Sequence, residues 1–241
     1  MTRADKGEVL SILESIDQAA KAELVLGLCM KFANRFGFDR FLITQVVNPY
    51  GPDASKAMTH TNWNDELMAQ RFEGLKLLHD PVVQFGLRSR FPFAWTQAYE
   101  HASKYGKRIM DEARPYNLLA GYSFPMRRPG APIGGVSLGA ERYDMSAGDR
   151  ADMELVAMHT YSRLEQLHPH HLPAKIIQLS PQETDVLQFS ALGKSAWEIA
   201  KVLGITESGV KKALLRGRRK LGAVNTAQAC SSAISHDLIL P

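Results

Sequence analysis

Cysteine is scarce in this chain of 241 residues, which has two cysteines, Cys29 and Cys230, far apart in the sequence. A disulfide-stabilised secreted domain needs more cysteines at regular spacing, so these two indicate free thiols in a reducing compartment. Long apolar runs are also missing, because none approaches the roughly 18 residues that cross a membrane. The N-terminal residues Met1 to Lys6 carry no apolar segment of a signal peptide. We therefore expect a cytoplasmic protein with no membrane partner.

Motifs of known enzyme chemistry are missing as well. We find no nucleophile elbow, no glycine-rich phosphate loop and no spacing of side chains that holds a metal. His79 adjoins Asp80, and Glu100 adjoins His101, but adjacent side chains rarely converge on one substrate. An enzyme with a DNA-binding appendage is therefore disfavoured, and we predict no catalytic residue and no metal site.

The chain is long enough for two domains that each bury a core. Its content of 45% hydrophobic and 22% charged residues is typical of a globular protein. The net charge of +4 is unevenly placed, because the residues from Leu179 onward contain eight basic and five acidic side chains, a net charge of +3. This placement predicts that the C-terminal quarter contacts a phosphate backbone.

Residues 194–221 carry the signals of two helices joined by a tight turn. Ser195 is placed to cap the first helix, and Glu198 three residues later completes a capping box. Gly204 supplies the left-handed residue that ends this helix, and Thr206 is placed to cap the next one. The pattern predicts a helix-turn-helix.

The second of these helices is basic on its solvent faces and has no acidic residue between Val210 and Leu221. Val210, Leu214 and Leu221 are its expected buried contacts. Its basic residues are Lys211, Lys212, Arg216, Arg218, Arg219 and Lys220. A solvated basic helix in an ordinary hairpin is the alternative. The caps, the glycine turn and the one-sided charge together favour a recognition helix that enters a major groove.

Further helices flank this pair. Ser180 and Pro181 are placed as the cap and first position of a preceding helix that Gly193 closes, and residues 222–229 begin a fourth helix. We therefore predict an all-α four-helix domain over residues 178–241. The segment 168–177 reads as a linker; its histidines, His168, His170 and His171, are expected to be polar surface and not metal ligands.

Residues 1–167 alternate helical and strand patterns. Helices are expected over 9–36, 64–78, 105–116 and 149–167, and strands over 38–47, near 56–61, 121–126 and 135–140, with a short extended piece at 91–95. Asp80 and Pro81 are placed to begin one more helix. This order predicts an α/β/α sandwich around an antiparallel sheet, so the whole chain is expected to be of the α+β class. We take the long helix 149–167 as the candidate dimer interface.

The C-terminal segment resembles the DNA-binding domain of LuxR-type transcription factors over the runs LSPQETDVL, ALGKSAWEIAKVLGITESGVKK and RRKLGAVNTAQA. Gly209 stands where such helices usually carry Thr, and Ala213 where His is common. These two differences affect which operator sequence the helix would recognise. The N-terminal half resembles the autoinducer-binding domain of the same family. The matching residues are Asp80-Pro81-Val82-Val83, Trp95, Gly121-Tyr122-Ser123-Phe124-Pro125 and Gly135-Val136-Ser137.

The resemblance implies an N-acyl- or aryl-homoserine lactone between the sheet and one helical layer. Asp80 would accept from the ligand amide N–H, Trp95 would pack on the lactone ring, and Ser137 would bond near the acyl carbonyl. Trp63 falls where a Tyr often touches that carbonyl, and its indole N–H is a possible substitute. For each residue alone, a structural role as helix cap, core aromatic or small strand residue is the simpler interpretation.

Two positions depart from the family pattern. Leu67 stands thirteen positions before Asp80, where a Trp usually donates to the lactone carbonyl, and Arg71 stands nine before it, where a Tyr is usual. Either Trp63 or Arg71 takes over this polar contact, or the ligand has a different head group.

The leading hypothesis is a quorum-sensing transcriptional activator that binds an acyl-homoserine lactone, dimerises and reads a two-fold symmetric operator, with RNA polymerase as a further partner and no other cofactor. The expected DNA-binding residues are Ser195, Thr206, Ser208, Lys211, Lys212, Arg216, Arg218 and Lys220. Base readout is assigned to Ser208 and Lys212, and most of the other cations are assigned to phosphates. The alternative is a LuxR-type regulator that is ligand-independent or responds to a non-lactone or aryl-type molecule.

Overall fold

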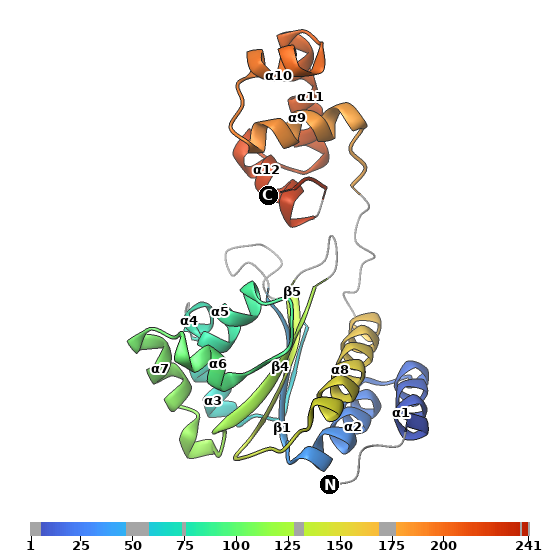
Figure 1. Ribbon diagram of the computed structural model, residues 1–241, viewed down its shortest axis with the longest axis vertical. Coiled ribbons are helices and arrows are strands. Elements are labelled where there is room, and N and C mark those ends of the chain that lie inside the picture. Colours follow the sequence, from blue (N-terminus) through green and yellow to red (C-terminus); the bar gives the residue numbers. More distant parts are fainter. Residues whose placement is uncertain are drawn as a thin grey trace. The chain divides into compact units, whose positions relative to one another are not determined.

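The structure, a computed structural model, describes residues 6–46, 58–73, 76–127, 133–168, 177–236 and 238–240. These residues fall into two compact units, one ending at residue 168 and the other beginning at residue 177. The N-terminal unit combines a sheet with helices and the C-terminal unit is helical (Figure 1). The predicted linker histidines His170 and His171 lie outside the described residues.

An antiparallel sheet organises the N-terminal unit. Its described strands are β1 (Arg40–Val46), β2 (Thr59–Thr61), β3 (Phe93–Ala94), β4 (Ala120–Met126) and β5 (Ile133–Ala140). Their order across the sheet is β2-β1-β5-β4-β3, and every neighbouring pair runs antiparallel.

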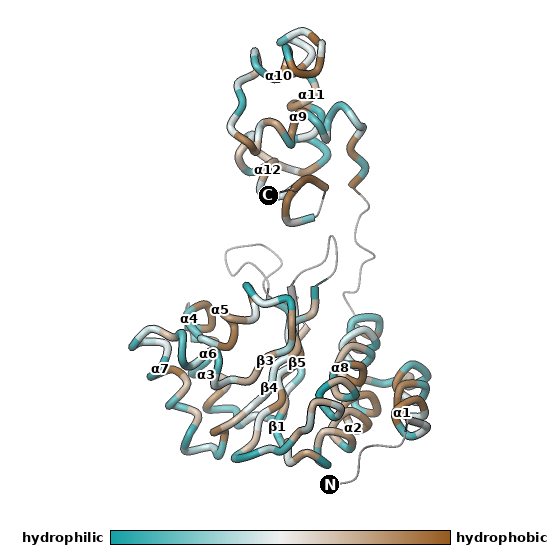
Figure 2. The backbone as a smooth tube through the Cα atoms, viewed as in Figure 1, coloured by the Kyte–Doolittle hydropathy of each residue, from teal (hydrophilic) through white to brown (hydrophobic). Residues whose placement is uncertain are grey.

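One face of the sheet carries large side chains and is covered by α2 (Ala22–Ala33) and α8 (Ala147–Leu167), and α1 (Lys6–Gln18) packs on the outside of these two helices. Phe124 of β4 and Val136 and Leu138 of β5 point to this side and join the larger hydrophobic core. Figure 2 shows hydrophobic segments along α1, α2 and α8. Burial of these apolar side chains is the main force that holds the layer on the sheet.

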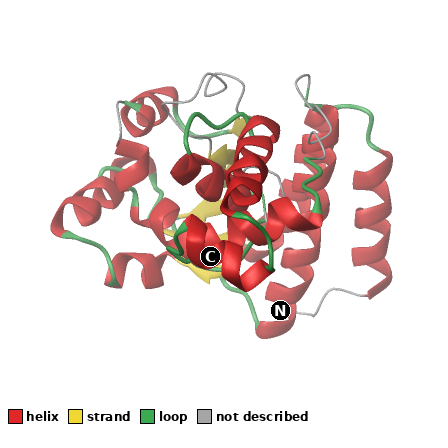
Figure 3. Ribbon diagram, turned by 90° about the horizontal axis from the view of Figure 1, so that it is seen from above, coloured by secondary structure: helices red, strands yellow, loops and turns green. Residues whose placement is uncertain are grey.

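The other face is covered by five short helices, which gives the predicted α/β/α sandwich. They are α3 (Asp65–Phe72), α4 (Lys76–His79), α5 (Pro81–Arg88), α6 (Trp95–Glu100) and α7 (Lys104–Asp111). Figure 3 shows helices on both sides of the strands. Short 3₁₀ turns, η1 (Asn34–Phe36) and η3 (Arg114–Tyr116), precede β1 and β4. The predicted α+β class is confirmed.

Two predicted helices are broken in the structure. The predicted helix 9–36 is two helices, because the chain turns after Gln18, where the Arg163 Nε of α8 donates to the Ala19 carbonyl at 2.8 Å. The predicted helix 64–78 is likewise divided into α3 and α4, because Glu73, at the end of α3, has an extended backbone with φ −66° and ψ 120°. At the first of these places a tertiary contact overrides the local periodicity.

Trp95 was predicted to be extended, and this prediction is wrong, because Trp95 begins helix α6. The Gln97 side-chain oxygen accepts from the Ala94 backbone N–H at 2.9 Å and so satisfies a donor at the start of the helix. This local bond turns the chain directly after β3 and places the indole of Trp95 over the sheet.

The C-terminal unit contains the predicted helices α9 (Pro181–Ala191), α10 (Ala196–Leu203), α11 (Glu207–Lys220) and α12 (Thr226–Ser235). The predicted caps Ser180, Ser195 and Thr206 each accept from a backbone N–H three residues on. Gly193 and Gly204 have left-handed φ values of 79° and 65° at the predicted helix ends. The helix-turn-helix is therefore specified by capping residues and glycines that can be identified in the sequence itself.

Within the described ranges no helix is both long and apolar enough to cross a membrane. Those same ranges hold no group of three or more side chains arranged to ligate a metal ion.

Candidate functional site

A cavity lies between the sheet and the helical layer α3–α7. Its floor is made by small residues that pair across β4 and β5, so little side-chain volume stands on this face of the sheet. The pairs are Gly121 with Gly139, Ser123 with Ser137 and Pro125 with Gly135. The space left open to water-sized molecules is about 130 Å³, several times the share of one water, so the cavity is large enough for part of an organic molecule.

The wall of this cavity is mostly apolar with a small polar centre. Its apolar lining residues include Leu42, Leu77, Val82, Val83, Leu87, Phe93, Met110, Ala113 and Leu118. The polar lining residues include Thr44, Arg71, Asp80, Ser123 and Ser137. Such a combination is typical of sites that bind a small molecule with an apolar body and a few oriented polar atoms.

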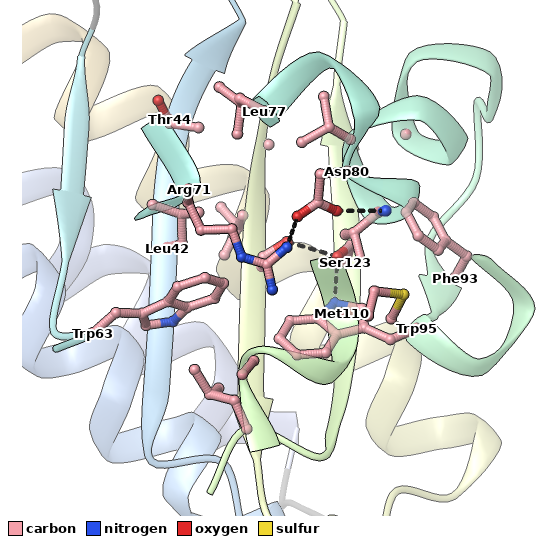
Figure 4. Close-up of a pocket in the computed structure, with 18 of the residues that line it drawn as sticks. Leu42, Thr44, Trp63, Arg71, Leu77, Asp80, Phe93, Trp95, Met110 and Ser123 are labelled. Carbon is pink, nitrogen blue, oxygen red and sulfur yellow. Dashed lines mark hydrogen bonds and ion pairs between the residues drawn. The ribbon is translucent and has the colours of Figure 1, made fainter. Parts of the chain in front are cut away.

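An ion pair between Arg71 and Asp80 forms part of the polar centre (Figure 4). Arg71 projects from α3 and is 4% exposed, and Asp80, at the start of α5, is 6% exposed. The Arg71 Nη1 donates to Asp80 Oδ2, while Asp80 Oδ1 accepts from the Val82 backbone N–H at 2.8 Å and caps α5. The predicted cap is confirmed, and both carboxylate oxygens have a partner within the protein.

Trp63 stands beside this pair. The centre of the Arg71 guanidinium lies 6.0 Å from the Trp63 ring centroid, and the ring meets Trp95 edge-to-face with centroids 6.2 Å apart. The indole N–H of Trp63 and the Arg71 Nε are both buried and have no hydrogen-bond acceptor among the described residues. Because buried donors are normally satisfied, these two unpaired N–H groups are unusual for the interior of a folded chain.

Trp95 is held by a short chain of hydrogen bonds across the sheet. Its indole N–H donates to Ser123 Oγ at 2.9 Å, and Ser123 Oγ lies 2.6 Å from Ser137 Oγ. A Cβ added at Gly121 would overlap the Trp95 ring, so the absence of a side chain there is what lets the indole lie flat on β4. Ser123 was not assigned a role from the sequence; its link to Ser137 depends on strand register, which the sequence does not state.

The structure brings most of the predicted ligand-binding residues together. Trp63, Arg71, Asp80, Trp95 and Ser137 all line the cavity. Leu67 does not belong to the described lining; it is fully buried in the apolar cluster that also contains Trp63 and Trp95. Ligand contact by these six residues stays a prediction.

The second candidate site is the exposed basic surface of α11. The side chains of Ser208, Lys211 and Lys212 are exposed near the beginning of this helix. Ser195 Oγ donates to Glu198 Oε2 at 2.6 Å, and Thr206 Oγ1 accepts from the Gly209 N–H at 3.0 Å, so both hydroxyls already serve as helix caps.

The remaining predicted DNA contacts of α11 are engaged inside the unit. Lys220 Nζ donates to Glu183 Oε2 at 2.6 Å, and Arg216 Nε donates to Glu183 Oε1 at 3.2 Å. The Arg218 Nη2 donates to the Val224 carbonyl. The basic surface therefore has two parts. Near the start of α11, Lys211 and Lys212 are exposed to solvent. Near its end, the basic side chains also hold the helix in place within the unit.

Glu183 is 2% exposed and lies in the first turn of α9. Burial by itself raises its pKa, but the hydrogen bonds from Lys220, the Ser180 backbone and Arg216 prevail and lower the pKa from 4.5 to about 2. The carboxylate is therefore charged at neutral pH and joins α9 to the last turn of α11.

Comparison with known protein families matches both units. Residues 21–164 match the model of the autoinducer binding domain, and residues 177–233 match that of the bacterial regulatory proteins of the luxR family. The first match alone covers more than half of the chain.

Individual proteins are similar as well. The quorum sensing-dependent transcriptional regulator RpaR of Rhodopseudomonas palustris is 33% identical over 180 residues, which are 74% of this chain and 72% of RpaR. The transcriptional activator BjaR1 of Bradyrhizobium diazoefficiens is 28% identical over the full length of both chains. The crystal structure of Escherichia coli SdiA matches with a TM-score of 0.64 and 21% identity over 98% of this chain and 99% of SdiA, which shows a shared fold.

Proposed function

The chain belongs to the LuxR family of quorum-sensing transcriptional regulators that carry an autoinducer-binding domain, and from this premise we propose that its ligand is an N-acyl- or aryl-homoserine lactone. It is a transcriptional regulator and not an enzyme. The lactone would occupy the cavity between the sheet and helices α3–α7, with its acyl or aryl group against the apolar wall.

The observation that carries this proposal is the pair of unpartnered buried donors on two residues that line a mostly apolar cavity. The indole N–H of Trp63 and the Nε of Arg71 would donate to the carbonyl oxygens of the ligand, one on the amide and one on the lactone ring. They thereby replace the donor that is lost where Leu67 stands. Trp95, fixed by Ser123, would form the surface against which the lactone ring packs.

We further propose that the regulator acts as a homodimer on double-stranded DNA. Two copies of α11 would then enter successive major grooves of a two-fold symmetric operator, with half-sites roughly 34 Å apart. Ser208 and Lys212, exposed near the start of α11, would contact base edges. Activation of transcription would also require contact with RNA polymerase.

A second candidate is a regulator of this family that works without a ligand or responds to a non-lactone molecule. Leu67 favours it, because this side chain is apolar, fully buried and unable to bond a lactone carbonyl. SdiA has been solved in complex with octanoyl-rac-glycerol, so a related fold takes a ligand without a lactone ring.

Thermal unfolding of the purified chain with a panel of acyl- and aryl-homoserine lactones tests the proposal. A ligand that binds only the folded state raises the unfolding midpoint, so we expect a rise that depends on the acyl group. Trp63→Phe removes one donor and should reduce the rise, whereas Trp197→Phe, in the C-terminal unit, should not. A well-folded chain that no lactone stabilises would contradict the proposal and favour the second candidate.

A further inference from the structure

Each oxygen of the Asp80 carboxylate in the cavity wall already accepts a hydrogen bond from the protein, and this bears on which ligands fit the proposed lactone function. Asp80 Oδ2 accepts from Arg71 Nη1, and Asp80 Oδ1 accepts from the Val82 N–H. The guanidinium also balances the charge of the carboxylate in a place where both side chains are less than a tenth exposed. A further N–H donor would therefore meet a neutralised acceptor, which bonds less strongly than a free carboxylate does.

Two N–H donors of the polar centre, in contrast, have no hydrogen-bond acceptor among the described residues. They are the buried Trp63 Nε1 and Arg71 Nε, and both of these residues line the cavity. Thr44, a further polar lining residue, is bonded to the Met58 carbonyl and lies 2.9 Å from Thr59 Oγ1. The serine hydroxyls of the floor are bonded to each other and to Trp95.

From this imbalance we propose that the cavity recognises the carbonyl oxygens of an acyl ligand and does not require its amide N–H. Acyl esters of a hydroxylactone are then ligands alongside the corresponding N-acyl amides. Arg71 is the specificity-determining residue, because it both supplies a donor to the ligand and occupies the acceptor that an amide N–H would otherwise use. This inference rests on the proposed lactone function.

The test compares two ligands that differ in a single group, an N–H in one and an oxygen atom in the other. An N-acyl-homoserine lactone carries an amide N–H where its ester counterpart, an α-acyloxy-γ-butyrolactone with the same acyl chain, carries an oxygen. The acyl chain is the one that gives the largest thermal stabilisation in the lactone panel. Dissociation constants of both ligands are measured with the unmodified full-length chain by calorimetry.

We expect the two dissociation constants to agree within about threefold, which is less than 1 kcal/mol. Binding of the amide with an ester more than about tenfold weaker would overturn the inference and leave the lactone function intact. Binding of neither ligand would overturn the lactone function itself, and the inference with it. The wild-type comparison needs no variant, so its outcome does not depend on the folding of an altered chain.

Arg71→Met provides a second, independent readout. Removal of the guanidinium frees Asp80 Oδ2, so this variant should bind the amide in preference to the ester. A folded Arg71→Met chain that still binds both ligands equally would overturn the role of Arg71. Arg108→Met, on the exposed side of α7, is the matched control and should leave the ratio of the two constants unchanged.

Discussion

The Glu183 carboxylate at the start of α9 accepts a hydrogen bond of 2.6 Å from the Lys220 ammonium at the end of α11. The same carboxylate bonds Arg216 and completes the capping box with Ser180. One buried side chain thus fixes the first helix of the C-terminal unit to the helix assigned to DNA recognition.

The stability of the C-terminal unit should consequently depend on acid pH. Because the folded pKa of Glu183 is lowered from 4.5 to about 2, its contribution is present above about pH 4.5 and is lost as the pH falls through 2. We expect a loss of about 1–2 kcal/mol over this range, since Lys220 and Arg216 are partly solvated. Urea unfolding followed by circular dichroism at graded pH measures it.

The control is made on the same helix. Glu183→Gln should lower the stability at neutral pH and remove this part of the pH dependence, whereas Asp185→Asn, which removes an exposed charge from α9, should retain it. Equal pH profiles for the wild type and Glu183→Gln would show that Glu183 does not hold the two helices together.

The cations of α11 should differ in their contributions to DNA binding. Lys211 and Lys212 are exposed and carry no ion pair in the described structure, so we expect each alanine variant to reduce the salt slope of DNA affinity by about 1. Lys220→Ala should have a smaller effect, because Glu183 already neutralises much of its charge. Lys31→Ala, exposed on α2, is the charge-matched control. Equal slopes for all four variants would refute this assignment.

Ser123 should be more important for folding than Ser137. Ser123→Ala leaves the buried indole N–H of Trp95 without its acceptor, which should cost about 1–3 kcal/mol of unfolding free energy. Ser137→Ala removes only the second member of the chain and leaves the Trp95 bond in place, so its cost should be smaller. Urea titration of both variants measures these two costs. A larger loss of unfolding free energy for Ser137→Ala would contradict the predicted order.

A methyl group at Gly121 should displace Trp95. The added Cβ would overlap the indole ring and also lie 2.6 Å from the Leu138 carbonyl oxygen, so Gly121→Ala should destabilise the N-terminal unit by about 1–3 kcal/mol. It should also abolish stabilisation by lactones. Gly27→Ala, on the exposed face of α2 with no atom within 4 Å of the new Cβ, should instead be neutral or stabilising. Retained lactone binding by Gly121→Ala would argue against Trp95 as a wall of the site.

The C-terminal unit could be predicted almost completely because its signals are local. The Ser195 and Thr206 caps and the left-handed Gly204 act within a few residues, so chain order alone specifies them. The N-terminal unit could be predicted only in outline, because packing decides its details. The break after Gln18 depends on Arg163, which lies far along the chain.

The candidate site could likewise be predicted only in part from the sequence. The family pattern located Trp63, Asp80, Trp95 and Ser137, and all four line one cavity. The Arg71–Asp80 ion pair and the role of Ser123 could not be predicted. The first depends on how α3, α4 and α5 fold back on one another, and the second on the register of β4 against β5.

The most direct test of the account is the effect of the lactone on DNA affinity. Duplexes selected from a random pool by the full-length chain should contain a two-fold symmetric sequence, and their dissociation constant is then measured with and without saturating lactone. Coupling between the cavity and α11 predicts a change of about fivefold or more, in either direction. An unchanged constant, with the lactone shown by thermal unfolding to be bound, would contradict the hypothesis that this regulator responds to the lactone in its binding of DNA.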